Sequence, residues 1–112
     1  MKDPIIFIYH INDAIKDIED FTKKTSKKKF LKDKKVQSAV VRQIEVIGEA
    51  VKNLPLEFKK KNSKIEWKAI SGMRDKLIHH YFGVDFEKIW GVINKDIPLL
   101  KKEIKSILLK LK

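Results

Sequence analysis

Apolar residues recur at steps of three and four along most of this chain, which is the spacing of one face of an α-helix. Asp3 and Pro4 supply an N-cap acceptor and a first-turn proline. We therefore expect a first helix that starts at Pro4 and ends between Thr22 and Ser26. Its core face comprises Ile8, Ile11, Ile15 and Ile18, with Ala14 and Phe21 beside them.

A second helical pattern follows, with Asp33 as its expected cap. The strongly basic segment 27–35 before it is interpreted as a connector with one helical turn. Gly48 lies inside this helix, where glycine costs roughly 1 kcal/mol relative to alanine, so it indicates a close approach to another backbone. Arg42 and Glu49, two turns apart, favour a solvated charge pair. The apolar positions are Val36, Val40, Ile44, Ile47, Val51 and Leu54.

A third helix is predicted from a capping box, in which Ser63 is followed by Glu66 three residues later. The segment from Pro55 to Lys61 before it is short and poorly patterned. Gly83 is a natural C-terminal cap for the third helix. Its expected core positions are Trp67, Ile70, Met73 or Leu77, and Ile78.

Asp85 can cap the last helix, whose apolar seam steps by three and four without a miss. Pro98 interrupts that seam, removes one backbone donor and is expected to bend the helix near Asp96. The seam residues are Trp90, Ile93, Ile97, Leu100, Ile104, Ile107 and Leu111.

The chain shows no strand alternation, internal repeat or glycine-rich loop. We therefore predict an all-α fold, an up-and-down helical bundle of four main helices plus short extra turns, with residues 1–112 as a single domain. Apolar residues outside the main stripes predict a second face for dimerisation. They include Phe7, Tyr9, Phe82 and Phe86.

Composition narrows the class of protein. Charged residues make up 37% of the 112 residues, and no run approaches the roughly 18 apolar residues that span a bilayer. The first residues lack the uncharged core and cleavage site of a signal peptide. The absence of cysteine excludes disulfides and thiolate metal sites. We expect a cytoplasmic protein without membrane contact.

The net charge of +11 makes an anionic partner plausible, and nucleic acid is the commonest one. A lysine-rich proteome would produce the same excess, so the lysine runs 27–29 and 59–61 are each interpreted as solvated. Of 26 basic residues only Arg42 and Arg74 are arginine. A planar guanidinium favours bidentate binding of phosphate.

Rare residue types gather between Trp67 and Phe82, where Arg74, His79 and Tyr81 stand close together. At about 100° per residue, His79 lies about 140° round the helix from Arg74. Either the arginine side chain bends toward the histidine, or two copies of this helix pool their side chains across a two-fold axis.

Arginine and histidine without a carboxylate or cysteine cluster suit metal-free cleavage of RNA, and we expect neither a metal nor a cofactor. A neutral histidine can accept the proton of a ribose 2′-hydroxyl, and an imidazolium can protonate the leaving oxygen. His79 and His80 diverge by about 100° and cannot form a two-ligand metal site on one helix face. Alternatively, each histidine is a surface or packing residue.

The order Arg74, four residues, His79, one residue, Tyr81 resembles the signature of the HEPN superfamily, specifically the HepT-like toxins of prokaryotic toxin–antitoxin pairs. The resemblance extends to Trp67, residues 70–75 and 77–82, Val84-Asp85, Ile89-Trp90 and 96–98, and to the stretch 47–50.

That resemblance implies a helical bundle that dimerises and acts as a metal-independent endoribonuclease. Arg74 and His79 would be catalytic, with Asp75 and Tyr81 as supporting groups. A minimal nucleotidyltransferase antitoxin would neutralise this type VII-like toxin by transferring AMP to Tyr81. Two alternatives remain: a HEPN subunit that binds RNA or a partner without turnover, and a structural partner of a nucleotidyltransferase.

Overall fold

The computed structural model describes the backbone of residues 3–78 and 85–111, and the side chains of residues 3–73 and 85–111. This part of the chain is helical and contains no strand, which confirms the all-α prediction. The elements are α1 (Pro4–Thr22), α2 (Lys27–Phe30), α3 (Lys34–Asn53), α4 (Leu56–Lys61), α5 (Trp67–Ile78), α6 (Phe86–Gly91), the π-helical turn η1 (Val92–Asp96) and α7 (Ile97–Lys110).

The structure confirms the three predicted N-caps, which are Asp3, Asp33 and Asp85. The Asp3 carboxylate accepts from the backbone N–H of Ile5 at 3.0 Å. Asp33 accepts from the N–H of Val36 at 3.2 Å. Asp85 accepts from two backbone N–H groups at the start of α6. Each bond satisfies a donor that the first turn of a helix leaves without a partner.

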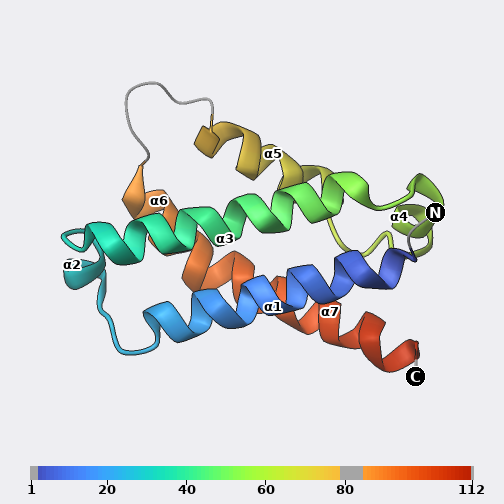
Figure 1. The fold of residues 1–112 in the computed structure, drawn as a ribbon, viewed down its shortest axis with the longest axis horizontal. Coiled ribbons are helices and arrows are strands. Elements are labelled where there is room, and N and C mark those ends of the chain that lie inside the picture. Colours follow the sequence, from blue (N-terminus) through green and yellow to red (C-terminus); the bar gives the residue numbers. More distant parts are fainter. Residues whose placement is uncertain (1–2, 79–84, 112) are drawn as a thin grey trace.

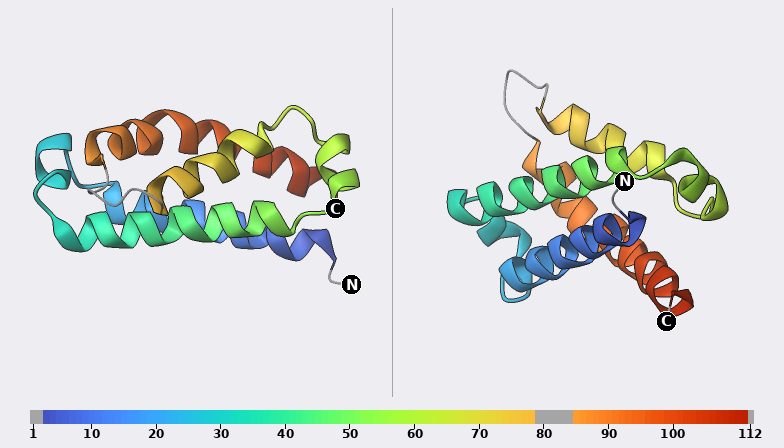
Figure 2. Two further views of the ribbon diagram at one scale, coloured as in Figure 1. Left: turned by 90° about the horizontal axis from the view of Figure 1, so that it is seen from above. Right: turned by 45° about the vertical axis from the view of Figure 1, so that its right-hand side comes forward.

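The two long helices α1 and α3 lie side by side and run in opposite directions (Figure 1). Helix α5 packs along α3, while α7 packs against α1 (Figure 2). Lys101 of α7 donates to the Glu19 carboxylate of α1 at 2.9 Å and joins these helices at their rim.

The core forms where the apolar stripes of these helices meet. Its fully buried residues include all four isoleucines of the predicted first stripe, and Val40, Ile44 and Ile47 of the second. Gly48 is buried on α3, the helix that packs along α5. Burying these side chains supplies the main stabilisation of a helical bundle of this size.

Several predicted core positions are wrong. Phe21 is 39% exposed and Leu111 55% exposed, because each lies near the end of its helix. Conversely, Phe7 and Phe86 pack against the core instead of forming a second face. Of the four residues proposed for that face, only Tyr9 is an exposed residue of the described chain, and Phe82 lies outside the described residues.

The predicted capping box at Ser63 is also wrong, since α5 begins at Trp67. Residues 62–64 form a turn, and the N–H of Ile65 donates to the carbonyl of Asn62 at 3.3 Å. The segment 56–61, predicted to be poorly patterned, is the short helix α4. Gly83, the predicted C-terminal cap of this helix, lies outside the described residues.

The predicted bend in the last helix takes the form of the π-helical turn η1. Pro98 follows at the start of α7 and has no N–H to donate to a carbonyl one turn back. The N–H of Ile97 bonds to the carbonyl of Val92, five residues back. This wider turn divides the helix into α6 and α7.

Candidate functional site

Trp67 anchors the start of the helix that carries the arginine–histidine stretch. Its indole Nε1 donates to the backbone carbonyl of Asn62 at 3.1 Å, and its ring lies 6.4 Å from that of Phe58 on α4. Only 6% of Trp67 is exposed. Two aromatic rings and one hydrogen bond therefore fix the position of this helix end.

One face of α5 is held against the rest of the bundle. Ile70 and Met73 are partly buried and pack against the core, as predicted from their spacing. At Gly72 a Cβ atom would meet nothing within 4 Å. Ala69 is exposed, and both of these small residues line a groove beside α5.

The candidate site residues are placed only in part. The backbones of Arg74 and Asp75 lie in the last two turns of α5, so Arg74 is four residues before the helix end at Ile78. Their side chains are outside the described part of the structure. His79, His80 and Tyr81 also lie outside the described residues, so the proposed pairing of Arg74 with His79 stays a prediction.

A groove of about 820 Å³ runs between α5 and the α6–η1–α7 segment. Its floor is mainly apolar, with Ile70 and Met73 on one side and Ile89 and Leu100 on the other. Leu99 lines it and is 60% exposed. Four carboxylates and two lysines also line it, namely Glu66, Asp85, Asp96, Glu103, Lys64 and Lys88. We call this the acid-rimmed groove.

Sequence reasoning missed this groove. Its two walls come from residues 64–73 and 85–103, which the bundle brings together although neither segment alone has an unusual pattern. The available signal was the exposed Leu99, which stands outside the apolar seam of α7. An exposed leucine beside a groove indicates a surface that can bury apolar area on association.

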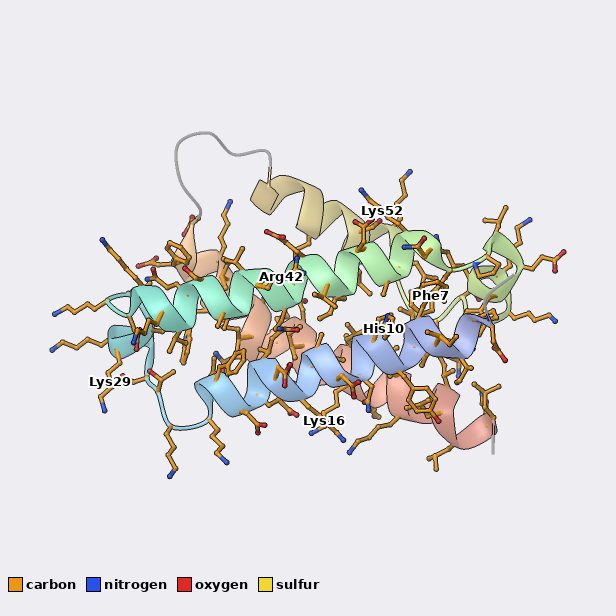
Figure 3. The ribbon with its side chains drawn as sticks, viewed as in Figure 1. Phe7, His10, Lys16, Lys29, Arg42 and Lys52 are labelled. Atoms are coloured by element: carbon orange, nitrogen blue, oxygen red, sulfur yellow. The ribbon has the colours of Figure 1, made fainter. Side chains whose placement is uncertain are left out.

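The second arginine, Arg42, lies on the exposed side of α3 (Figure 3). Its guanidinium is 3.6 Å from the Glu45 carboxylate, and 70% of the Arg42 side chain is exposed. An exposed pair of this kind contributes little to stability. The ion pair that the structure gives for Arg42 is therefore with Glu45, one turn along α3, and not the predicted pair with Glu49.

Within the described residues, no three histidine, cysteine, aspartate or glutamate side chains gather in a group that could hold a metal ion. No helix within residues 3–78 and 85–111 is long and apolar enough to cross a membrane.

The family model and the similar proteins found by comparison indicate the same family. The sequence model of the "Ribonuclease HepT-like" family matches residues 11–107. A Methanocaldococcus jannaschii protein with the provisional name of RNase is 50% identical over 96% of this chain and 88% of its own length. The "Probable ribonuclease HepT" of Thermococcus cleftensis is 46% identical over 90% of this chain and 92% of its own. No significant match was found among solved structures.

Proposed function

The chain belongs to the HepT-like ribonuclease family, and on this premise we propose that it is the toxin of a type VII-like toxin–antitoxin pair. It acts as a metal-independent endoribonuclease and works as one HEPN-like domain. Arg74 and His79 are the catalytic residues, with Asp75 beside the arginine as a supporting group. The observation that carries this proposal is the Arg74–His79–Tyr81 stretch on and just after α5.

The chemistry needs a base, an acid and a stabilising cation. One neutral His79 accepts the proton of a ribose 2′-hydroxyl, and the 2′ oxygen forms a bond to the adjacent phosphorus. The bond from phosphorus to the 5′ oxygen breaks, and the same His79, now an imidazolium, gives that oxygen its proton. Arg74 stabilises the charge on the phosphoryl oxygens. The products carry a cyclic phosphate and a free 5′-hydroxyl.

This reaction is proposed to occur between two copies of the chain. Arg74 and His79 diverge by about 140° on a regular helix, and a two-fold axis would bring the arginine of one copy to the histidine of its partner. Support comes from the acid-rimmed groove beside α5, which offers apolar surface including the exposed Leu99. Burial of such surface stabilises protein association.

Tyr81 is proposed to be the off-switch. A minimal nucleotidyltransferase antitoxin transfers AMP from ATP to the Tyr81 hydroxyl, with pyrophosphate as the leaving group. The added nucleotide puts bulk and negative charge two residues from His79, where the substrate phosphate must bind. Repulsion between the two anions then prevents RNA from entering.

The direct test is cleavage of a labelled single-stranded RNA in the presence of EDTA. Arg74→Ala and His79→Ala are expected to lower the rate by at least about 100-fold, the range for loss of a general base or a charge stabiliser. Arg42→Ala and His10→Ala are matched controls, because both residues are exposed, and these variants should cleave like the parent.

Retention of cleavage by either active-site variant would overturn the residue assignment. Loss of cleavage in the unmodified protein on addition of EDTA would overturn metal independence. A protein that binds RNA in a salt-sensitive way yet never cleaves it would be the non-catalytic binding subunit instead.

A further inference from the structure

Lysines of α2, of α3 and of the turns that join α1, α2 and α3 line a second hollow, at the corner where these helices meet. It has a volume of about 900 Å³. We call it the basic hollow, and its lining residues are Asp20, Phe21, Lys23, Lys24, Thr25, Lys29, Lys32, Asp33, Lys34, Lys35 and Val36. Six lysines against two aspartates give a local charge of +4. All six lysines are exposed, and Lys29 extends outward from α2 (Figure 3).

This charge is concentrated and does not simply follow from a lysine-rich composition. The acid-rimmed groove has two lysines and four carboxylates among its lining residues, a charge of −2. The net charges of the residues that line the two hollows therefore differ by six, although both hollows lie on the same basic protein. Lys23 and Lys35 are twelve residues apart in the sequence, and the corner gathers both around one space.

The corner has a fixed structure. The Ser26 hydroxyl accepts from the N–H of Lys29 at 3.2 Å and caps α2. Phe30 is fully buried, with its ring 5.3 Å from that of Trp90. The buried amide of Gln37 donates to the Phe30 carbonyl at 2.9 Å. Because these contacts hold the backbone, the segment that carries the lysines does not have to be ordered when a ligand binds, which lowers the entropic cost of binding.

Phe21 adds an aromatic group to this charged space. It lines the basic hollow, is 39% exposed and belongs to the last turn of α1. A large apolar ring among lysines is the combination that binds single-stranded nucleic acid, because a base stacks on the ring while cations contact the phosphates. An acidic protein, as the alternative ligand, would bind the lysines but has no base to stack on the ring of Phe21.

We propose that the basic hollow is a second RNA-binding site, which holds the single-stranded backbone beside the cleaved nucleotide and stacks one base on Phe21. The position supports this role: α2 contacts α6, and α5 runs toward the same end of the molecule (Figure 1). RNA as the ligand rests on the proposed function. Cleavage chemistry at Arg74 and His79 is not required for the binding itself.

The charge test measures binding of a labelled oligouridine by fluorescence anisotropy, in the Arg74→Ala background so that cleavage does not interfere. The triple change Lys24→Gln, Lys29→Gln, Lys32→Gln is expected to weaken binding about tenfold or more. It should also lower the slope of log affinity against log salt by about 2, at about 0.7 for each lost phosphate contact.

The matched control is Lys59→Gln, Lys60→Gln, Lys61→Gln. These three lysines form the last turn of α4 and line neither hollow, and α4 lies at the opposite end of the molecule from α2 (Figure 1). The control removes the same charge and should retain the parent's slope. Equal losses in the two triple variants would mean diffuse attraction and would overturn the proposal, as would parental binding by the first.

The stacking test separates the ring from the charge. Phe21→Ala should weaken binding of oligouridine about fivefold or more, within the range of a lost stacked base, and leave binding of an abasic oligomer of equal length unchanged. Tyr9→Ala is the control, because Tyr9 is another exposed aromatic residue of α1. Equal effects of Phe21→Ala on both oligomers would overturn the stacking role.

Failure of the proposed function has a different signature. If the parent protein never cleaves RNA but the Lys24, Lys29 and Lys32 variant still binds it more weakly than the control does, the nuclease assignment fails and the basic hollow stands. If the parent cleaves while both triple variants bind equally, the nuclease assignment stands and the basic hollow fails.

Discussion

The indole of Trp67 and the backbone carbonyl of Asn62, joined by a hydrogen bond of 3.1 Å, determine where α5 begins. Asn62 is itself held by α4, because its side-chain amide donates to the Phe58 carbonyl at 2.9 Å. The helix that carries Arg74 therefore starts from a fixed point seven residues before that arginine.

Removal of this hydrogen bond should destabilise the protein measurably. Trp67→Phe keeps an aromatic ring but loses the N–H donor, and we expect a cost of about 1 kcal/mol. For a domain of this size the midpoint of thermal unfolding should fall by about 4 °C. Circular dichroism measures it, with Tyr9→Phe as a control; an unchanged midpoint would contradict the anchoring role.

Phe30 should be among the most costly side chains to truncate. It is fully buried and contacts the rings of both Phe86 and Trp90. We expect Phe30→Ala to lower the free energy of unfolding by about 3–5 kcal/mol. Leu56→Ala, at a residue 65% exposed, should change it by less than about 0.5 kcal/mol. Urea titration compares them, and similar midpoints would be inconsistent with this core.

The pair between Lys101 and Glu19 should contribute weakly. Although the two atoms are 2.9 Å apart, about a third of each side chain is exposed. Solvent screening reduces such a pair to about 0.2–1 kcal/mol. A double-mutant cycle with Lys101→Met and Glu19→Gln measures the coupling, which should decrease as salt is raised. Coupling that does not depend on salt would mean that a different interaction joins α1 and α7.

If catalysis combines Arg74 of one copy with His79 of its partner, two inactive variants should complement each other. An equal mixture of Arg74→Ala and His79→Ala subunits gives half heterodimers after exchange, each with one intact pair of two. The mixture should recover about a quarter of the parental rate, as two-fold symmetry requires. Recovery of no activity, with heterodimers verified by native mass spectrometry, would place both residues of a pair on one copy.

Tyr81→Phe should separate activity from its control. The variant lacks the hydroxyl that would accept AMP but retains Arg74 and His79, so it should cleave RNA at close to the parental rate. Incubation with the antitoxin and ATP should silence the parent and leave the variant active. Intact mass reports the added nucleotide. Modification of the variant at the parental level would exclude Tyr81 as the acceptor.

Local sequence predicted the helices and several of their ends because their determinants are local. Asp3, Asp33 and Asp85 each bond to donors within three residues, so a short window of sequence contains the whole interaction. The predictions for Phe21 and Phe86 were wrong because the spacing of apolar residues does not distinguish a buried position from an exposed one at these two sites. Only the position of neighbouring helices leaves Phe21 exposed and packs Phe86 against Phe30.

The features of the candidate site likewise divide into those that the sequence determines and those that the structure adds. The spacing of Arg74, His79 and Tyr81 is a property of the sequence, and so is the membership in the HepT-like family. The structure adds where the motif helix starts and which surfaces flank it. Contact between Arg74 and His79 depends on their side chains and on a second copy of the chain, and the complementation experiment tests it.

The amino-acid order by itself determined an all-α bundle, the capped helix starts and a distinctive arginine–histidine–tyrosine stretch, because helical period, capping and spacing each act within a few residues. Only the tertiary structure decided that six lysines within residues 23–35 line one hollow together with Phe21, while carboxylates spread from Glu66 to Glu103 line the other. Charges that are distant in sequence interact according to their distance in space, and the packing of helices sets that distance.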